Sequence, residues 1–272
     1  MSAAEPALSS TIPEQSVCIM LPTYNEIQNL TGMVQRLRAT LPEATIVILD
    51  DRSPDGTGDL ADDLATADSQ VRVVHRPRKE GLGPAYMQGM GWARTHGYQA
   101  AVQIDADGSH QPEQLPSLLR AGGQADVVIG SRWVPGGAVR NWPVHRKALS
   151  LGGNLFVRVA LGLPVRDATA GFRVYRLDAL DSMHLRDVAS QGYCFQVDLT
   201  LRAYDAGLRI VEVPIEFIER EHGNSKMGTS IVTEALVRVS AWGVQRRIAQ
   251  ARSHVGRLRA RATALPEPQK GP

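Results

Sequence analysis

Short apolar runs alternate along the chain with longer segments in which apolar residues recur every three or four positions. Five of the apolar runs predict strands: 17–21, 45–50, 71–75, 100–104 and 126–130. Helical spacing follows the first four of them, over about 27–41, 57–66, 83–96 and 112–121, and Asn25 is the expected N-cap of the first helix. Strands that are apolar throughout and alternate with helices indicate a parallel sheet covered on both faces. We therefore predict an α/β fold of the Rossmann-like, doubly wound type with a mainly parallel sheet.

The pattern becomes less regular after residue 140. Further helices are predicted near 143–161, over 195–206 and over 229–262. The segments expected along the chain are a flexible leader at 1–15, a main domain at 16–228, a C-terminal helical segment at 229–262 and a disordered tail at 263–272.

Polar motifs follow four of the five predicted strands. PTYNE follows the first strand, DDRSPDGTGD the second, DADGSH the fourth and GSR the fifth. The carboxyl ends of parallel strands meet at one edge of a sheet, and ligands of doubly wound sheets bind there. The sequence therefore predicts a functional site at this edge.

Asp105 and Asp107, two residues apart just beyond a predicted strand, are candidate metal ligands. Paired carboxylates in this place suit a hard divalent cation such as Mg²⁺ or Mn²⁺, which substrate phosphates would share. A calcium-binding loop is excluded, because its sixth and twelfth positions would be His110 and Pro116. Two other interpretations stay open: a phosphatase that uses Asp105 as its nucleophile, and a turn whose aspartates cap a helix.

The remaining motifs suit a nucleotide or phosphate ligand. Asp50 and Asp51 could accept hydrogen bonds from a ribose or a base edge, although SPDGT is equally a turn that opens a helix. The planar fork of arginine suits phosphate, and the basic residues expected to face the acidic pair are Arg132, Arg146, Arg166, Arg173, Arg220, His222 and Lys226. The chain lacks both the G-x-G-x-x-G and the G-x-x-x-x-G-K-[ST] motifs, which disfavours a nicotinamide or P-loop site.

Composition and terminal sequence features indicate which partners and which cellular location to expect. A formal net charge of +2 disfavours a globally basic nucleic-acid-binding protein, so we expect no nucleic-acid partner. The two cysteines lie in apolar surroundings, which is typical of a reducing compartment. The first residues lack the basic and apolar regions of a signal peptide, and no apolar run reaches the roughly 20 residues that cross a bilayer. We expect a cytoplasmic protein, peripheral on the cytoplasmic face of a membrane if it is attached to one.

Eight motifs in order along the chain resemble those of the polyprenol-phosphate mannose synthases, also called dolichyl-phosphate mannosyltransferases, within the family-2 inverting glycosyltransferases. The motifs are LPTYNE (21–26), DDRSPDGT (50–57), DADGSHQPE (105–113), GSR (130–132), RKALS (146–150), ATAGFRVYR (168–176), GYCFQVD (192–198) and REHGNSK (220–226). The resemblance covers about residues 16–228 and implies a glycosyltransferase A-type catalytic domain. It further implies a GDP-mannose donor, a polyprenyl phosphate acceptor and a divalent metal, Mg²⁺ or Mn²⁺.

The resemblance also assigns roles to single residues. Asp105 and Asp107 would bind metal and diphosphate, with Ser109 as a candidate third metal ligand, and Asp107 and Arg132 would be catalytic. The other donor- and phosphate-binding residues would be Pro22, Tyr24, Glu26, Leu49, Asp51, Ala106, Arg220 and Lys226. The chain departs from the family at Gly108, where members usually carry a larger apolar residue. A sister enzyme with a UDP-sugar donor and a non-catalytic nucleotide-binding scaffold are the alternatives.

The C-terminal helical segment has apolar residues in two stripes. The first comprises Ile231, Ala235, Val239 and Trp242, and the second comprises Val244, Ile248, Ala251, Val255 and Leu258. Arginines surround the second stripe, at 246, 247, 252, 257, 259 and 261. A basic amphipathic helix of this kind is typical of contact with an anionic membrane surface or an integral-membrane partner, here through residues 244–261. The alternative is a helix that packs on the catalytic domain with its arginines in water.

Overall fold

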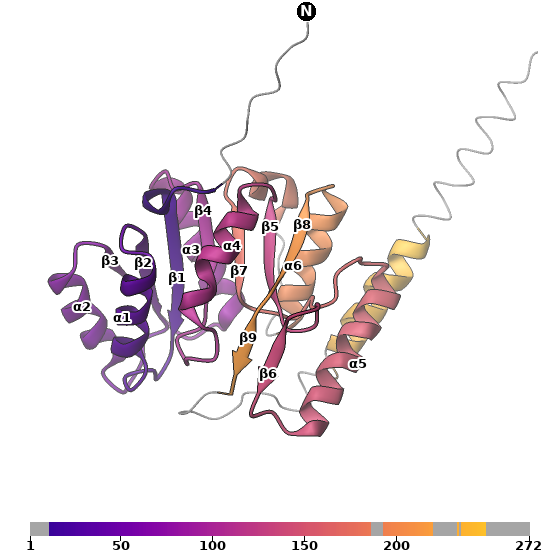
Figure 1. Ribbon diagram of the computed structural model, residues 1–272, viewed down its shortest axis with the longest axis horizontal. Coiled ribbons are helices and arrows are strands. Elements are labelled where there is room, and N and C mark those ends of the chain that lie inside the picture. Colours follow the sequence, from indigo (N-terminus) through magenta and orange to yellow (C-terminus); the bar gives the residue numbers. More distant parts are fainter. Residues whose placement is uncertain (1–10, 186–192, 220–232, 234, 249–272) are drawn as a thin grey trace, which may run out of the picture.

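The computed structural model describes residues 11–185, 193–219, 233 and 235–248. The strands of these residues form a seven-stranded sheet in the order β3-β2-β1-β4-β7-β5-β8 (Figure 1). Its strands are β1 (Val17–Thr23), β2 (Thr45–Asp50), β3 (Val71–His75), β4 (Ala100–Gln103), β5 (Val127–Ser131), β7 (Arg173–Arg176) and β8 (Ile210–Pro214). A separate parallel pair, β6 (Ala138–Arg140) and β9 (Glu216–Ile218), extends beyond the carboxyl ends of β5 and β8.

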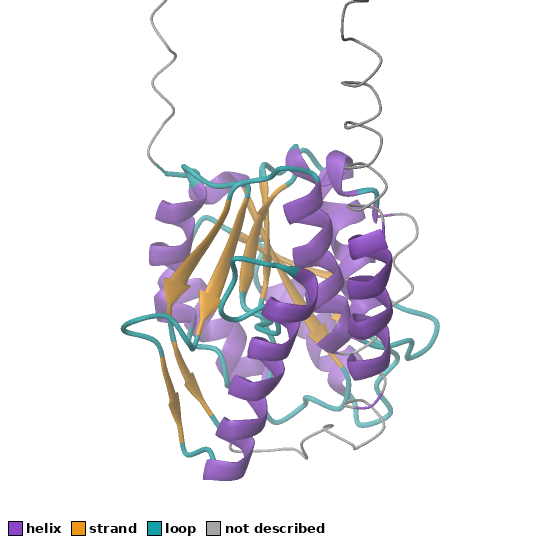
Figure 2. Ribbon diagram, turned by 90° about the vertical axis from the view of Figure 1, so that its right-hand side faces the viewer, coloured by secondary structure: helices purple, strands orange, loops and turns teal. Residues whose placement is uncertain are grey.

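Helices cover both faces of the large sheet (Figure 2). The apolar core on one face includes residues of α1 (Leu30–Thr40), α2 (Thr57–Ala67) and α4 (Leu115–Gly122), which follows the short 3₁₀ turn η2 (Pro112–Gln114). The core on the other face includes residues of α3 (Leu82–Thr95), α5 (Val144–Leu161), α6 (Tyr193–Asp205) and the turn η3 (Ala179–Met183). The remaining 3₁₀ turn, η1 (Glu14–Ser16), precedes β1. The predicted α/β layout with two covered faces is confirmed.

The mainly parallel sheet contains one reversed strand that the hydrophobic pattern did not predict. β7 lies between β4 and β5 and runs antiparallel to both. Its run Arg173–Arg176 places an arginine at each end, so it does not have the continuous apolar pattern of the other central strands. The reversal brings the loop before β7 to the edge where β4 and β5 end.

The first helix begins later than predicted. α1 starts at Leu30, whereas Asn25 has a positive φ of 59° and Ile27 is 41% exposed. The intervening backbone is held instead by the loop after β2, because the amide of Asn25 donates to Ser53 Oγ and that of Glu26 donates to Thr57 Oγ1. Asn25 is therefore a loop residue rather than the N-cap.

The helical residues 235–248 lie beside α5 at the outer edge of the second face (Figure 1). Val239 is 1% exposed within the core and Trp242 packs against it, so the first apolar stripe packs on the protein as far as it is described. Val244 and Ile248 of the second stripe are exposed, at 57% and 47%. Ile231 and all residues beyond 248 lie outside the described residues. Among the helices that the structure describes, none combines the length and hydropathy needed to span a bilayer.

Candidate functional site

Two loops at the carboxyl edge, after β1 and after β2, are joined by hydrogen bonds. Thr23 Oγ1 donates to Asp50 Oδ1 over 3.2 Å, and Ser53 donates to the same carboxylate through its amide and its hydroxyl. Asp50 is only 2% exposed. Its carboxylate therefore organises the turn, whereas its neighbour Asp51 was the residue assigned to the donor.

The predicted nucleotide-binding side chains gather around these loops. Lys79 Nζ lies 3.5 Å from the centre of the Tyr24 ring, and Glu26 accepts a hydrogen bond from Asn29. Asp51, at 7% exposure, forms a buried ion pair with Arg76. Burial raises the pKa of Asp51, while the Arg76 guanidinium acts in the opposite direction. Pro22 and Leu49 are buried at the ends of β1 and β2.

Arg76 is a site residue that the sequence did not indicate. Besides Asp51, its guanidinium donates to Gln88 Oε1 over 3.0 Å and to Glu80 Oε2 over 3.1 Å. These partners come from the loop after β3 and from α3, so the ion pair ties both to the end of β2. A lone arginine after a strand carries no local pattern that would reveal such contacts.

The acidic pair follows β4 on a short turn. Ala106 is 3% exposed and belongs to the apolar core, while the flanking Asp105 and Asp107 are partly exposed. Ser109 is buried and donates to Asp107 Oδ1 through its amide, over 3.1 Å, and through its hydroxyl, over 2.6 Å. Gly108 has a φ of +76°, which a larger apolar residue would adopt only with strain. The departure at Gly108 thus fits the turn, and Ser109 supports Asp107; its role as a metal ligand stays a prediction.

Asp105 is contacted by two buried rings. The hydroxyl of Tyr86, on α3, donates to Asp105 Oδ1 over 2.9 Å, and His110 Nδ1 lies 3.8 Å from Oδ2. His110 packs between Phe172 and Phe217, each 5.2 Å away between ring centres. Burial lowers the pKa of His110 even though Asp105 opposes the shift, so the ring is neutral at physiological pH.

The donor chemistry of this turn fits a divalent cation. Carboxylate oxygens are the ligands that Mg²⁺ and Mn²⁺ prefer, and Mg²⁺ commonly binds one or two carboxylates together with phosphates and water. Within the described residues no three His, Cys, Asp or Glu side chains are grouped to hold a metal. A cation on Asp105 and Asp107 would therefore complete its coordination with a bound diphosphate and water.

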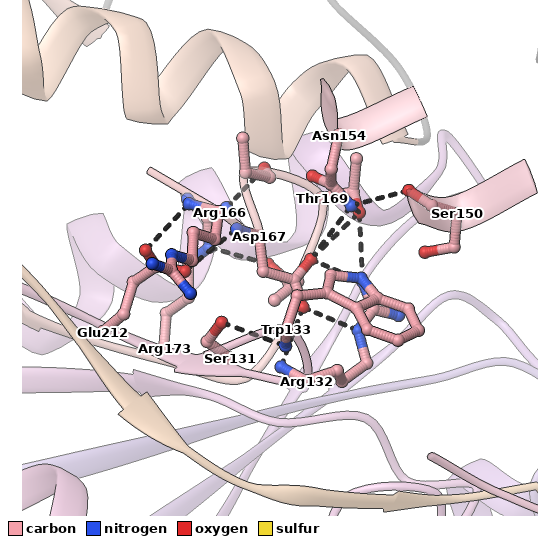
Figure 3. A network of polar contacts seen from close by, with 12 residues as sticks. Ser131, Arg132, Trp133, Ser150, Asn154, Arg166, Asp167, Thr169, Arg173 and Glu212 are labelled. Carbon is pink, nitrogen blue, oxygen red and sulfur yellow. Dashed lines mark hydrogen bonds and ion pairs between the residues drawn. The ribbon is translucent and has the colours of Figure 1, made fainter. Parts of the chain in front are cut away.

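Arg132 lies at the end of β5 in a buried network centred on Asp167 (Figure 3). Its Nε and Nη2 donate to the two carboxylate oxygens of Asp167 over 2.8 and 2.7 Å, and Nη2 also donates to Thr169 Oγ1. Asn154 of α5 reaches Thr169 over 3.1 Å and Asp167 over 3.4 Å. Burial alone would raise the pKa of Asp167, but the Arg132 guanidinium together with hydrogen bonds from the Arg132 amide and Thr169 holds the pKa below its usual value.

The other predicted basic residues divide into four groups. Arg173 is wholly buried, and its guanidinium donates to the carbonyl oxygens of Ala168, Ala170 and Gln196, so the expectation that it faces the acidic pair is wrong. The side chain of Arg166 is exposed. Arg146 lies beside the Arg132 network. The predicted phosphate-binding residues Arg220 and Lys226, with His222, lie outside the described residues.

An apolar cleft opens beside the Arg132 network. Arg132, Trp142 and Arg146 line it together with Ser150 and Thr169. Most of the remaining wall is apolar and comes from α5, α6 and the helical residues 235–248: Leu149, Gly153, Phe156, Val157, Val197, Ala235, Leu236 and Val239. The Arg146 guanidinium lies 4.1 Å from the centre of the Trp142 ring and pairs with Glu219. The cleft thus joins basic groups to a long apolar surface.

Comparison with known proteins places this site in a family. Residues 18–183 match the family described as "Glycosyl transferase family 2". The chain belongs to glycosyl transferase family 2. The glycosyltransferase is 52% identical to undecaprenyl-phosphate mannosyltransferase of Micrococcus luteus over 240 residues, covering 88% of this chain and 99% of that protein. It is 50% identical to polyprenol monophosphomannose synthase of Mycolicibacterium smegmatis over 245 residues, covering 89% and 92% of the two chains.

A solved structure supports the fold independently. The glycosyltransferase superposes on glucosyl-3-phosphoglycerate synthase from Mycobacterium tuberculosis, in a complex with Mn²⁺, UDP and glucosyl-3-phosphoglycerate, with a TM-score of 0.56. The two are 20% identical, and the likeness covers 91% of this chain and 86% of that one. The glycosyltransferase A-type α/β fold and the resemblance to polyprenol-phosphate mannose synthases are both confirmed.

Proposed function

We propose that the glycosyltransferase transfers mannose from GDP-mannose to a polyprenyl phosphate, forming β-mannosyl phosphopolyprenol and GDP. The observation that carries the proposal is the pairing of two chemically different sites on one sheet edge. One is the acidic turn at Asp105 and Asp107, beside the nucleotide loops, and the other is the basic and apolar cleft beside Arg132. The names of the two relatives, an undecaprenyl-phosphate mannosyltransferase and a polyprenol monophosphomannose synthase, support the choice of sugar and acceptor.

Unpaired hydrogen-bond donors favour a phosphate at the basic end of the cleft. Within the described residues, Trp133 Nε1, Trp142 Nε1 and Arg146 Nε are buried and have no hydrogen-bond partner. Buried polar groups are normally paired, so three such donors close to Arg132 favour an anionic acceptor as their missing partner. A polyprenyl phosphate supplies that anion, and its isoprenoid chain matches the apolar wall formed by α5 and residues 235–248.

On the donor side, Tyr24, Glu26 and Asp51 line the loops where the guanosine would bind, with Pro22 and Leu49 as their buried support. Asp105 and Asp107 would hold Mg²⁺ or Mn²⁺ on the diphosphate, and the bound cation would neutralise charge as GDP departs. Arg220 and Lys226 remain proposed phosphate contacts.

The proposed acceptor would need no dedicated base. A phosphate monoester has its second pKa near about 6, so the acceptor is largely dianionic at neutral pH and needs no proton removed. Arg132 would orient that dianion, and its bidentate bond to Asp167 fixes the guanidinium plane. Attack from the face opposite the diphosphate would invert the α-linked donor to a β-linked product.

The acceptor's membrane would be met by α5 and the adjoining C-terminal helix. Of the twelve large hydrophobic side chains that are exposed among the described residues, nine lie on these two helices: Val144, Leu149, Leu151, Leu155, Val159, Leu236, Val237, Val244 and Ile248. Neither 144–161 nor 235–248 contains an acidic residue, and together they carry six Lys or Arg residues. An apolar face rimmed by cations suits an anionic leaflet. We infer peripheral attachment on the cytoplasmic side, continued by residues 244–261 toward the membrane or a membrane-bound partner.

The function is tested by incubating the protein with labelled GDP-mannose or labelled UDP-glucose, polyprenyl phosphate and Mg²⁺ or Mn²⁺. Label from GDP-mannose should enter the organic phase and disappear when EDTA is added. Asp107→Asn should abolish the transfer while leaving the melting temperature close to that of the wild type, because the side chain is partly exposed. Label from UDP-glucose alone would identify the sister activity, and full transfer in EDTA would contradict the metal role.

A further inference from the structure

We infer that Tyr86 is a positioning residue for the reaction: its hydroxyl fixes the Asp105 carboxylate so that one oxygen is presented to the metal–diphosphate group. The inference rests on the proposed function and adds a residue that neither the sequence motifs nor the family resemblance assigns. Tyr86 lies 19 positions before Asp105, on α3, and their contact is a 2.9 Å hydrogen bond from the phenol to Oδ1.

The Tyr86 ring is itself rigidly held. The side chain is 0% exposed in the core between the sheet and α3. Its ring stacks on that of Phe195 of α6, with centres 6.4 Å apart and planes inclined by 7°. A residue locked by packing in this way can fix a neighbour's orientation, which a mobile surface donor cannot do.

The Tyr86 hydroxyl is a buried donor whose acceptor is the Asp105 carboxylate. Phenylalanine would fill the same apolar space without a polar group that must be satisfied, so the hydroxyl is explained by what it does for Asp105.

The two oxygens of Asp105 therefore have different surroundings. Oδ1 accepts from Tyr86, whereas Oδ2 lies 3.8 Å from His110 Nδ1 and faces the backbone of Gly171, where an added Cβ would lie 3.8 Å from it. The terminal torsion of a carboxylate is soft, so a hydrogen bond from a rigidly packed donor narrows the orientations that Asp105 adopts. Hydrogen bonds to metal-binding carboxylates orient them and typically change metal affinity by about 10–100-fold.

The test compares Tyr86→Phe with Tyr175→Phe. Tyr175 is a matched control, because it is also 0% exposed in the same core but its hydroxyl accepts from Arg173 rather than meeting Asp105. Mn²⁺ is titrated into each full-length protein saturated with GDP, and binding is followed by calorimetry or by the loss of the free Mn²⁺ electron paramagnetic resonance signal. Tyr86→Phe should bind Mn²⁺ at least about tenfold more weakly, while Tyr175→Phe should stay within about twofold of the wild type.

The possible results distinguish failure of the positioning role of Tyr86 from failure of the proposed function. Equal Mn²⁺ affinity in wild type and Tyr86→Phe overturns the positioning role, and so does an equal loss in both tyrosine variants, which would indicate general loosening of the core. Failure of the wild type itself to bind Mn²⁺ with GDP would contradict the proposed function instead. Thermal melting of all three proteins establishes that each is folded at the temperature of the titration.

Discussion

At the scale of single residues, the site depends on charged groups that are buried in pairs. Asp51 with Arg76, and Asp167 with Arg132, each bring a carboxylate and a guanidinium out of water at the end of a strand. Taking both charges out of water is unfavourable, so such pairs add little net stability but make the loss of one partner severe. Their contribution is the fixed direction in which the remaining donors and acceptors point.

The Asp167–Arg132 pair gives a stability prediction. Asp167→Asn should lower the free energy of unfolding by about 3–5 kcal/mol near neutral pH, because the buried Arg132 charge loses its partner. Asp181→Asn, which breaks the exposed pair with Arg94, should cost less than about 1 kcal/mol. Urea unfolding followed by circular dichroism measures both.

The pH dependence of the stability lost in Asp167→Asn provides a second test of the Asp167–Arg132 pair. The fold depresses the pKa of Asp167, so the pair's stabilisation is present above the unfolded pKa near about 3.9 and is lost as the pH falls through the lower folded value. The gap between wild type and Asp167→Asn should therefore shrink in acid, below about pH 4. A gap that stays constant down to acid unfolding would show that the lost stability comes from packing rather than from the charge.

At the scale of elements, apolar runs were sufficient to locate the five parallel strands β1 to β5, whereas β8, which is parallel to β5, was not predicted. β1, β2 and β5, for example, are buried at every position, and a strand covered on both faces needs no polar alternation. The reversed β7 escaped prediction because Arg173 and Arg176 interrupt its apolar character and its pairing is set by long-range contacts. The start of α1 was placed too early because the hydrogen bonds that hold residues 25 and 26 come from a loop about 30 positions away.

The candidate site likewise combines residues that are neighbours in the sequence with residues that meet only through the fold. Residues next to one another in the chain, such as Asp105 and Asp107, form a pattern that sequence can reveal. Tyr86 and Asp167 could not be found in this way, because each meets its partner 19 or 35 positions away and nothing local distinguishes it from an ordinary core tyrosine or loop aspartate. A tyrosine on the buried face of a predicted helix is the nearest available signal for the former.

The contact between α5 and residues 235–248 gives a testable prediction about the packing of these two helices. A Cβ on Gly243 would lie 2.7 Å from the carbonyl oxygen of Ala160, so the two helices can approach only because this residue is glycine. Gly243→Ala should destabilise the protein by about 1–3 kcal/mol through overpacking. Gly152→Ala is the matched control on the exposed face of α5, where a Cβ meets nothing within 4 Å; it should be stabilising by up to about 1 kcal/mol. Equal behaviour of the two variants in urea unfolding would contradict the close packing.

At the scale of the whole molecule, the proposed function has one edge of the sheet serve two substrates of opposite character. The nucleotide loops and the acidic turn lie by β1, β2 and β4, whereas the apolar cleft lies between α5, α6 and residues 235–248. Arg132, which directly follows β5, lines the cleft. In the proposed reaction, a water-soluble donor and a membrane-bound acceptor would thus approach from different sides.

This arrangement predicts that binding of the donor and access to the membrane can be separated. Deleting residues 244–272 removes the second stripe, in which Val244 and Ile248 are exposed, and six arginines. It leaves the buried Val239 and the partly buried Trp242 in place. Each basic group near an anionic surface contributes about 1 kcal/mol, so the truncated protein should bind vesicles containing anionic lipid far more weakly, as measured by co-sedimentation. Its affinity for GDP-mannose, measured by calorimetry, should stay unchanged, because the loops proposed to bind the donor follow β1, β2 and β4.

Transfer by the truncated protein distinguishes membrane attachment from damage to the active site. Transfer to long-chain polyprenyl phosphate in vesicles should fall several-fold, because fewer enzyme molecules reside on the surface that holds the acceptor. Transfer to a short-chain polyprenyl phosphate dissolved in detergent should continue at the wild-type rate, since that acceptor reaches the cleft from solution. Unchanged transfer in vesicles would remove the docking role of residues 244–261, and an equal loss with both acceptors would instead place these residues in support of the cleft.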